Sequence, residues 1–209
     1  MNVKGEPDFY VRNQNKIFLF ESKDVLINKV IKQSNDFTKI GQSFREKFYS
    51  IDSSDRPVGI FQLIRNIGKI LKNEVVYDDI NPNMVVYPIL ITYHNVFNTP
   101  GLNYIVNKWF KDELSKFNEE GYDISNIHNL VIIDIYILIV YHELFNTETL
   151  QLDDLIEKYE NITTHLNESG WSFDMMSPFS MYISNVIDKN GYGRSLGLFK
   201  ELGMTLLID

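Results

Sequence analysis

The chain has 209 residues, of which 44% are hydrophobic and 23% charged, so it is long enough to bury a substantial core and has an ordinary globular composition. Cysteine is absent, which excludes disulfide bonds and thiolate metal sites and suits a reducing compartment, expected here to be the cytoplasm. The net charge of −8 argues against general adhesion to nucleic acid, and the longest apolar run, residues 130–141, is too short for a membrane span of about 20 residues.

Residues 5–23 are predicted to form a β-hairpin, because aromatic and β-branched residues flank a short polar link. Folding the hairpin about Gln14 and Asn15 places Asp8 opposite Glu21, and directly opposed residues have Cβ atoms roughly 4.5–5.5 Å apart. Lys23 lies two positions after Glu21, so its side chain falls on the same face of the strand. We therefore expect Asp8, Glu21 and Lys23 to converge.

Two helices are predicted between this hairpin and the next strand. The first opens at Asp36 and runs to about Phe48, and the second has Ser54 or Asp55 as its N-cap and Pro57 in its first turn. Apolar residues recur at helical spacing along the second helix and predict its buried stripe. The opposite side of that helix carries Gln62, Arg65, Asn66 and Lys69.

The rest of the chain alternates strands and helices. Residues 84–93 read as a strand buried on both faces, in which Pro88 indicates a nearby bulge or sheet edge. A helix is expected after Gly101, a second buried strand over 130–135, a further helix over 136–145, and an acidic surface helix over 150–166. The order of these elements predicts an α/β or α+β domain with a mixed sheet flanked by helices.

Asp8, Glu21 and Lys23 are a suitable set for metal-dependent hydrolysis of a phosphodiester. Magnesium binds oxygen ligands and needs only one or two carboxylates from the protein. Two facing carboxylates repel each other, which raises one pKa, and a bound cation relieves this conflict. Lys23 could orient the attacking water and offset developing negative charge. The alternative is that both acids are solvated residues near the open end of a hairpin.

These residues resemble a known family. Pro7-Asp8 followed by Glu21-Ser22-Lys23 is similar to the motif of the PD-(D/E)XK nuclease superfamily, which includes many restriction-type endonucleases. The resemblance implies a restriction-endonuclease-like core, Mg²⁺ or Mn²⁺ held by Asp8 and Glu21, a catalytic Lys23 and a DNA substrate. Gln62 resembles the glutamine that the helix after the lysine strand often contributes in that family.

The basic side of the chain fits this expectation. Residues 1–74 carry 13 Lys and Arg against 9 Asp and Glu, whereas residues 75–209 carry 7 against 19. Arg65 and Lys69 are candidate phosphate contacts, with a solvated basic helix face as the alternative. We expect residues 1–145 to form a nuclease-like core and residues 146–209 to form a helical extension packed on it.

One departure from the family concerns the N-terminus. Members of the family generally have a helix before the Pro-Asp strand, whereas only residues 1–6 precede Pro7 here. We expect either that the chain is part of a longer protein or that a protein partner or upstream domain covers the exposed flank of the sheet. Two rival hypotheses remain: a catalytically inactive nuclease-fold module that binds nucleic acid or protein, and an unrelated α/β domain with surface acids.

Three further polar positions are interpreted as structural rather than catalytic. His142-Glu143 lacks the second histidine of a zinc-protease helix, so it is not expected to bind zinc. His94 is interpreted as a polar strand end. Asp134 is expected to cap the helix that follows it rather than to act as a buried functional acid.

Overall fold

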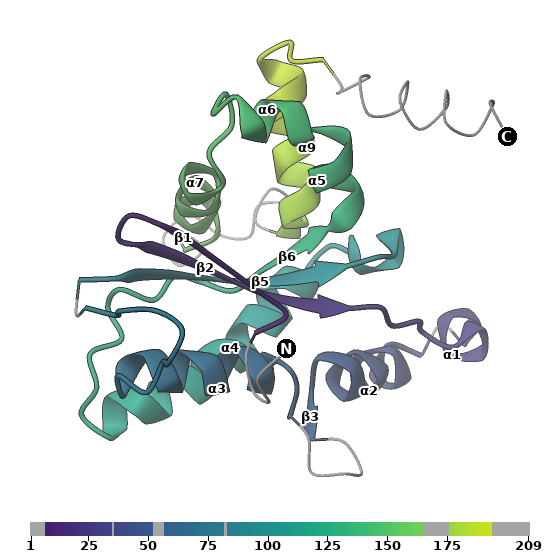
Figure 1. Ribbon diagram of the computed structural model, residues 1–209. Helices are drawn as coiled ribbons and strands as arrows, with labels where there is room; N and C mark the ends of the chain where they lie inside the picture. The colour runs from purple at the N-terminus through teal and green to yellow at the C-terminus, as the bar shows by residue number, and fades with distance from the viewer. Residues whose placement is uncertain (1–6, 35, 52–56, 82, 165–175, 194–209) are drawn as a thin grey trace, which may run out of the picture.

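The computed structural model describes residues 7–193 except 35, 52–56, 82 and 165–175. Its centre is a mixed sheet in the order β1-β2-β5-β6, in which β1 and β2 are antiparallel and the other neighbours are parallel. The strands are β1 Phe9–Asn13, β2 Lys16–Lys23, β5 Val85–Thr92 and β6 Val131–Asp134. Helices cover both faces of this sheet (Figure 1), which confirms the predicted α/β, or α+β, class.

The predicted register of the first hairpin is confirmed. Asn13 pairs with Lys16 and Phe9 pairs with Phe20, around a turn in which Gln14 adopts a positive φ of 56°. The next step of this ladder is position 8 opposite position 21. The hairpin therefore brings Asp8 to the end of β2 that carries Glu21.

Two hydrophobic cores lie on the two faces of the sheet. The first joins the sheet to α2 Phe37–Phe48, α3 Ile60–Leu71 and α4 Leu102–Glu119. The sheet residues in this core are Ile17, Leu19, Val86, Leu90 and Ile132. Odd positions of β2 and even positions of β5 therefore face α3 and α4. Full burial of a side chain of this size contributes about 1.5–3 kcal/mol to the stability of the fold.

The second core joins the opposite face to α5 Ile135–Val140, α7 Leu152–Thr164 and α9 Phe179–Lys189. Its buried sheet residues are Phe18, Tyr87, Ile89, Ile91, Val131 and Ile133. In the described part of the predicted C-terminal extension, α7 and α9 thus pack directly on the central sheet (Figure 1). The division of the chain at residue 145 stays a prediction. No helix of the described residues is long and apolar enough to cross a membrane.

The start of α3 differs from the prediction. Residues Pro57–Gly59 form the short strand β4, which pairs with β3 Tyr49–Ile51, and α3 begins only at Ile60. Gly59 is the N-cap with φ 55°, and a Cβ at this position would lie 2.6 Å from the backbone oxygen of Phe48. Only glycine fits such a conformation without strain. The proposed caps Ser54 and Asp55 lie outside the described residues.

The helix predicted over residues 136–145 is divided in the structure. It forms α5 Ile135–Val140 and α6 His142–Asn146, with a break at Tyr141. Asp134 is the N-cap of α5, where its carboxylate accepts a hydrogen bond from the N–H of Tyr136, so the predicted capping role is confirmed. Shorter elements complete the described chain: α1 Lys29–Gln33 and the 3₁₀ helix η1 Asn95–Phe97.

Pro88 lies opposite a change of register between β5 and the chain leading into β6. Val86 pairs with Ile127, but Ile89 pairs with Val131, so the second segment contains one extra residue. Proline has no N–H to donate to a ladder, which is why it suits such a bulge. Of the two alternatives predicted for Pro88, a bulge or a sheet edge, the structure shows the bulge, since β5 lies between β2 and β6.

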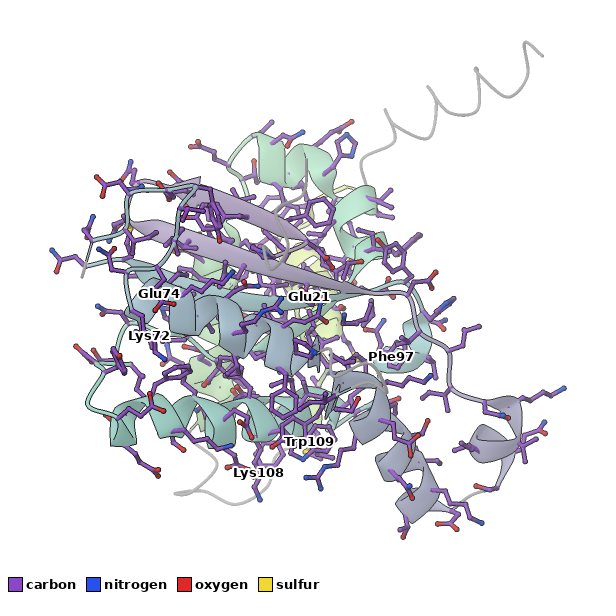
Figure 2. The ribbon with its side chains drawn as sticks, turned by 60° about the horizontal axis from the view of Figure 1, so that its bottom comes forward. Glu21, Lys72, Glu74, Phe97, Lys108 and Trp109 are labelled. Atoms are coloured by element: carbon purple, nitrogen blue, oxygen red, sulfur yellow. The ribbon has the colours of Figure 1, made fainter. Side chains whose placement is uncertain are left out.

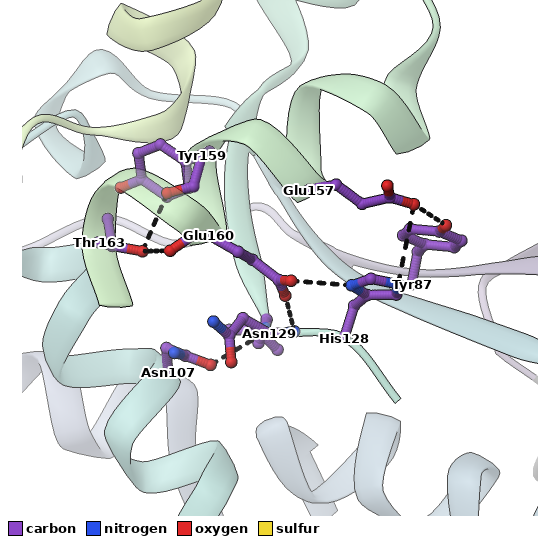
Figure 3. A network of polar contacts seen from close by, with 9 residues as sticks. Tyr87, Asn107, His128, Asn129, Glu157, Tyr159, Glu160 and Thr163 are labelled. Carbon is purple, nitrogen blue, oxygen red and sulfur yellow. Dashed lines mark hydrogen bonds and ion pairs between the residues drawn. The ribbon is translucent and has the colours of Figure 1, made fainter. Parts of the chain in front are cut away.

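Side chains satisfy the backbone groups that this bulge releases from the sheet. Glu160 of α7 accepts hydrogen bonds from the N–H of Asn129 and from the ring of His128, whose Nδ1 lies 2.8 Å from its carboxylate. Asn107 of α4 accepts from the N–H of Leu130 at 3.0 Å (Figure 3). Buried backbone groups need a hydrogen-bond partner. Because Glu160 of α7 supplies one, the network holds α7 against the chain that leads into β6.

The outer edge of β6 is occupied by further side chains. Asn103 of α4 accepts from the N–H of Ile132 at 2.7 Å and donates to the carbonyl of Leu130 at 3.3 Å. Ser180 of α9 accepts from the N–H of Asp134 at 2.8 Å. The other edge strand of the sheet, β1, instead exposes Phe9 and Val11, which are 58% and 49% accessible.

Candidate functional site

The candidate site lies at the carboxyl ends of the parallel strands. β2 ends at Lys23, β5 at Thr92 and β6 at Asp134, while Asp8 directly precedes the first residue of the antiparallel strand β1. In open α/β sheets, ligands bind outside the carboxyl ends of the strands. Glu21 (Figure 2) and Lys23 occupy odd positions of β2, and Lys23 reaches Gln62 of α3, so both lie on the side of the sheet that α3 covers.

The Lys23 ammonium is held by two side chains. Its Nζ lies 2.9 Å from Oε1 of Glu21 and donates to Oε1 of Gln62 at 2.5 Å. Glu21 is 1% exposed and the Lys23 side chain 13% exposed. The ammonium therefore sits in a largely desolvated position, where charged hydrogen bonds are stronger than at the surface.

Gln62 reaches Lys23 because of the way α3 begins. Gln62 is the third residue of the helix, and its Oε1 also accepts from the N–H of the N-cap Gly59 at 2.9 Å. A glutamine at this position commonly reaches back to the N-cap of its helix. One amide oxygen thus joins the helix cap to the lysine, so the position of the site depends on the glycine turn.

Asp8 is fixed by the neighbouring strand. Its Oδ2 accepts a hydrogen bond from the N–H of Ser22 at 2.8 Å, and the Ser22 hydroxyl donates to the hydroxyl of Tyr93 at 3.1 Å. Asp8 itself is exposed, so one of the two acids is open to solvent and the other is buried. The structure therefore brings Lys23 into contact with Glu21 and Gln62 and places Asp8 at the same end of β2, next to Ser22. The hairpin register predicted the convergence of Asp8, Glu21 and Lys23, whereas a place for Gln62 in the site was expected only from the family resemblance.

Burial dominates the electrostatics of Glu21. It raises the pKa of this carboxyl from 4.5 to about 6, against the opposing effect of the adjacent Lys23 ammonium. The negative charge of Asp8 raises the pKa further, and the positive charge of Arg65 lowers it. A carboxylate that is costly to ionise in this position gains from a nearby cation.

The two candidate phosphate contacts lie on α3 beyond Gln62. Arg65 is exposed and close enough to act electrostatically on Glu21. Lys69 is half-buried and lies one helical turn after Arg65, so it is farther along α3 from the Gln62–Lys23 contact. Their contacts with phosphate remain predictions.

The acids offer a small set of metal ligands. No group of three or more His, Asp or Glu side chains suited to a metal ion occurs among the described residues. Asp8 and Glu21 nevertheless fit Mg²⁺ or Mn²⁺ chemically, because both present hard oxygen donors and one of them is buried with a raised pKa. Magnesium usually keeps several waters and uses only one or two carboxylates.

Several contributors to the site were missed in the sequence. Gly59 holds Gln62 through its N–H, and Tyr93 holds Ser22 through its hydroxyl. The signal for Gly59 was the spacing Gly-x-x-Gln ahead of an apolar helical stripe, which is a capping pattern with glycine in place of Ser or Thr. Tyr93 had no comparable signal, because its role depends on the parallel register of β2 and β5.

Removing the ionisable carboxyl of Glu21 should change the pH dependence of stability in the metal-free protein. An acid whose pKa is raised by folding destabilises the folded state as the pH rises from its unfolded pKa of 4.5 to its folded pKa of about 6. Relative to Glu21→Gln, the native chain should therefore lose about 2 kcal/mol of unfolding free energy between pH 4.5 and pH 7. Urea denaturation at a series of pH values measures this difference.

The exposed Glu74 provides a matched control. Glu74→Gln should follow the native pH dependence. If Glu21→Gln also follows the native curve over this range, the raised pKa of Glu21 is wrong.

Comparisons with known proteins found no relative of this chain. No protein-family model matches the chain, and neither a curated protein nor a solved structure does so.

Proposed function

We propose that this chain is a metal-dependent nuclease domain of the PD-(D/E)XK type that hydrolyses phosphodiester bonds of DNA in the cytoplasm. The observation that carries the proposal is the contact of one desolvated lysine ammonium with both Glu21 and Gln62, beside Asp8. Glu21 and Lys23 come from β2, Gln62 comes from α3, and Asp8 directly precedes β1, at the carboxyl end of β2. Chance surface decoration does not explain a lysine and an acid that are both largely buried.

Each residue has a role in this proposal. A magnesium or manganese ion held by Asp8 and Glu21 would supply Lewis-acid activation of water and charge neutralisation. Lys23 orients the attacking water and places positive charge beside the phosphate as negative charge develops there. Gln62 keeps the ammonium in position, since its amide oxygen is itself fixed by Gly59.

The charge around the site supports a polyanionic substrate. Arg65 lies on the same helix as Gln62 and already acts on Glu21 from solvent. Arg65 and Lys69 would contact the phosphates that flank the scissile bond, which positions a backbone without reading its sequence. The two basic residues thus favour binding through phosphates over recognition of particular bases.

The direct test is cleavage by the purified chain. Linear duplex DNA, circular single-stranded DNA and RNA are incubated separately with Mg²⁺, with Mn²⁺ and with a chelator. We expect metal-dependent cleavage of at least one DNA substrate and none with the chelator or with Glu21→Gln. Absence of metal-dependent cleavage from all DNA substrates would overturn the nuclease proposal, and cleavage of RNA alone would change the substrate.

A second candidate function is a nuclease-fold module that binds without cutting. The ion pair between Lys23 and Glu21 favours it, because the two charges satisfy each other at 2.9 Å without a metal. The exposed Phe9 and Val11 on β1 fit a protein partner or an upstream domain that covers this flank of the sheet. Salt-dependent DNA binding without cleavage in the same assay would support this alternative.

A further inference from the structure

Thr92 is a buried hydroxyl next to the candidate site. It is the last residue of β5 and is fully buried, with 0% of its surface exposed. Its Oγ1 has no hydrogen-bond partner, a property that only Asn66 shares among the buried side chains of the described residues. Buried polar groups in proteins are nearly always hydrogen-bonded, so such a group calls for an explanation.

The strand register shows what Thr92 faces. Lys23 of β2 and Thr92 of β5 are paired in the parallel ladder, two positions beyond the pair Glu21 and Leu90. Leu90 belongs to the core beneath α3, so Thr92, two positions later on the same strand, points to that side. Lys23 points there as well, because its Nζ reaches Gln62 of α3.

Among the described residues, the lysine also has one donor without a partner. An ammonium carries three N–H groups, and the contacts with Glu21 and Gln62 account for two of them. The Lys23 side chain is 13% exposed, so its third N–H has little access to bulk water. Lys23 and Thr92, one carrying a donor and the other a group able to accept, are therefore neighbouring residues on the same face of the sheet.

We propose that Thr92 is a positioning residue for Lys23: its hydroxyl and the third N–H of the ammonium bind one shared water. Such a bridge is almost as favourable as a direct hydrogen bond. Asp8 lies on the β1 side of Lys23 and Thr92 on the β5 side, so the water fixes the ammonium from the side away from Asp8. The catalytic consequence rests on the nuclease function proposed above, but the contact itself does not.

Thr92→Val tests the contact, because valine keeps the shape of threonine and removes the hydroxyl. The primary measurement is hydrogen exchange of the Lys23 ammonium in metal-free protein labelled with ¹⁵N-lysine, assigned with Lys23→Arg. We expect exchange to be about 10-fold faster in Thr92→Val, because the ammonium loses one hydrogen bond to a charged group, and unchanged in Thr92→Ser. Thr163→Val, on the remote helix α7, should not change it.

Cleavage kinetics provide a second measurement. Thr92→Val should lower kcat about 10-fold with KM for DNA unchanged, and Thr92→Ser should restore it. Thr92→Cys, whose thiol is a weak hydrogen-bonding group, replaces the valine variant if that variant does not fold.

The outcomes separate the two proposals. Unchanged ammonium exchange in Thr92→Val, or a serine variant that behaves like the valine variant, overturns the role of Thr92. Faster exchange in Thr92→Val, in a chain that never cleaves DNA, supports the contact and overturns the nuclease function instead.

Discussion

Replacing Lys23 with alanine is expected to reduce metal-dependent DNA cleavage by about 10³-fold, the upper range for loss of one group that stabilises a transition state. The physical reason is the desolvated position of the ammonium, which Glu21 and Gln62 hold at 2.9 and 2.5 Å. A methyl group at this position neither orients water nor offsets charge on the phosphate. The rate is measured under single-turnover conditions with excess protein.

The fold should survive this substitution, although its stability will change. Without the ammonium, the Glu21 carboxylate stays buried and loses its ion pair, which raises its pKa further above the ordinary value. The variant should therefore be less stable than the native chain at pH 7 and closer to it at pH 5, as thermal melting can show. Undiminished cleavage by pure Lys23→Ala would contradict the catalytic assignment.

Lys39→Ala is the matched control for a lost positive charge. Lys39 lies on α2, its side chain is 65% exposed, and it pairs with the nearby Asp36. Loss of such a surface pair contributes little to stability. A similar loss of cleavage in both lysine variants would point to general electrostatic attraction of DNA rather than to a specific role for Lys23.

Magnesium or manganese should raise the melting temperature of the native chain, and Asp8→Asn should remove most of that increase. A ligand that binds only the folded state stabilises it by about 2.7 kcal/mol when present at 100 times its dissociation constant. Asp8 lies at the same sheet edge as Glu21, and its negative charge helps to raise the pKa of that carboxyl. Asparagine keeps the shape and the acceptor oxygen for Ser22 but lacks the charge.

Asp79→Asn, at an exposed position, controls for loss of one negative charge. It should retain the metal-dependent increase in full, and calcium at equal concentration controls for ionic strength. If the native chain gains nothing from either metal at millimolar concentration, the metal assignment of Asp8 and Glu21 is wrong.

The hairpin and the buried strands were predictable from sequence because their signals are local. The alternation of aromatic and β-branched residues around Gln14 and Asn15 specified the register that places position 8 opposite 21. The bulge near Pro88 followed from a missing donor within an apolar run. These features depend on residues close together along the chain.

The start of α3 and its consequences were not predictable in the same way. Pro57 is a good first-turn residue, but the pairing of β3 with β4 places it in a strand and moves the cap to Gly59. That shift brings the amide of Gln62 into contact with Lys23, which lies 39 positions earlier in the chain. The burial of Thr92 likewise depends on how three strands and their helices assemble, which no short pattern records.

The two edges of the sheet differ in whether another strand can join them. On β6, side chains of Asn103, Asn107 and Ser180 already bond outward backbone groups, so an approaching strand would find those positions taken. Growth of the sheet, by a second copy or by an extended peptide, is therefore directed to β1. Such an addition would lie next to Asp8, so lateral assembly and access to this acid would compete for the same border of the molecule.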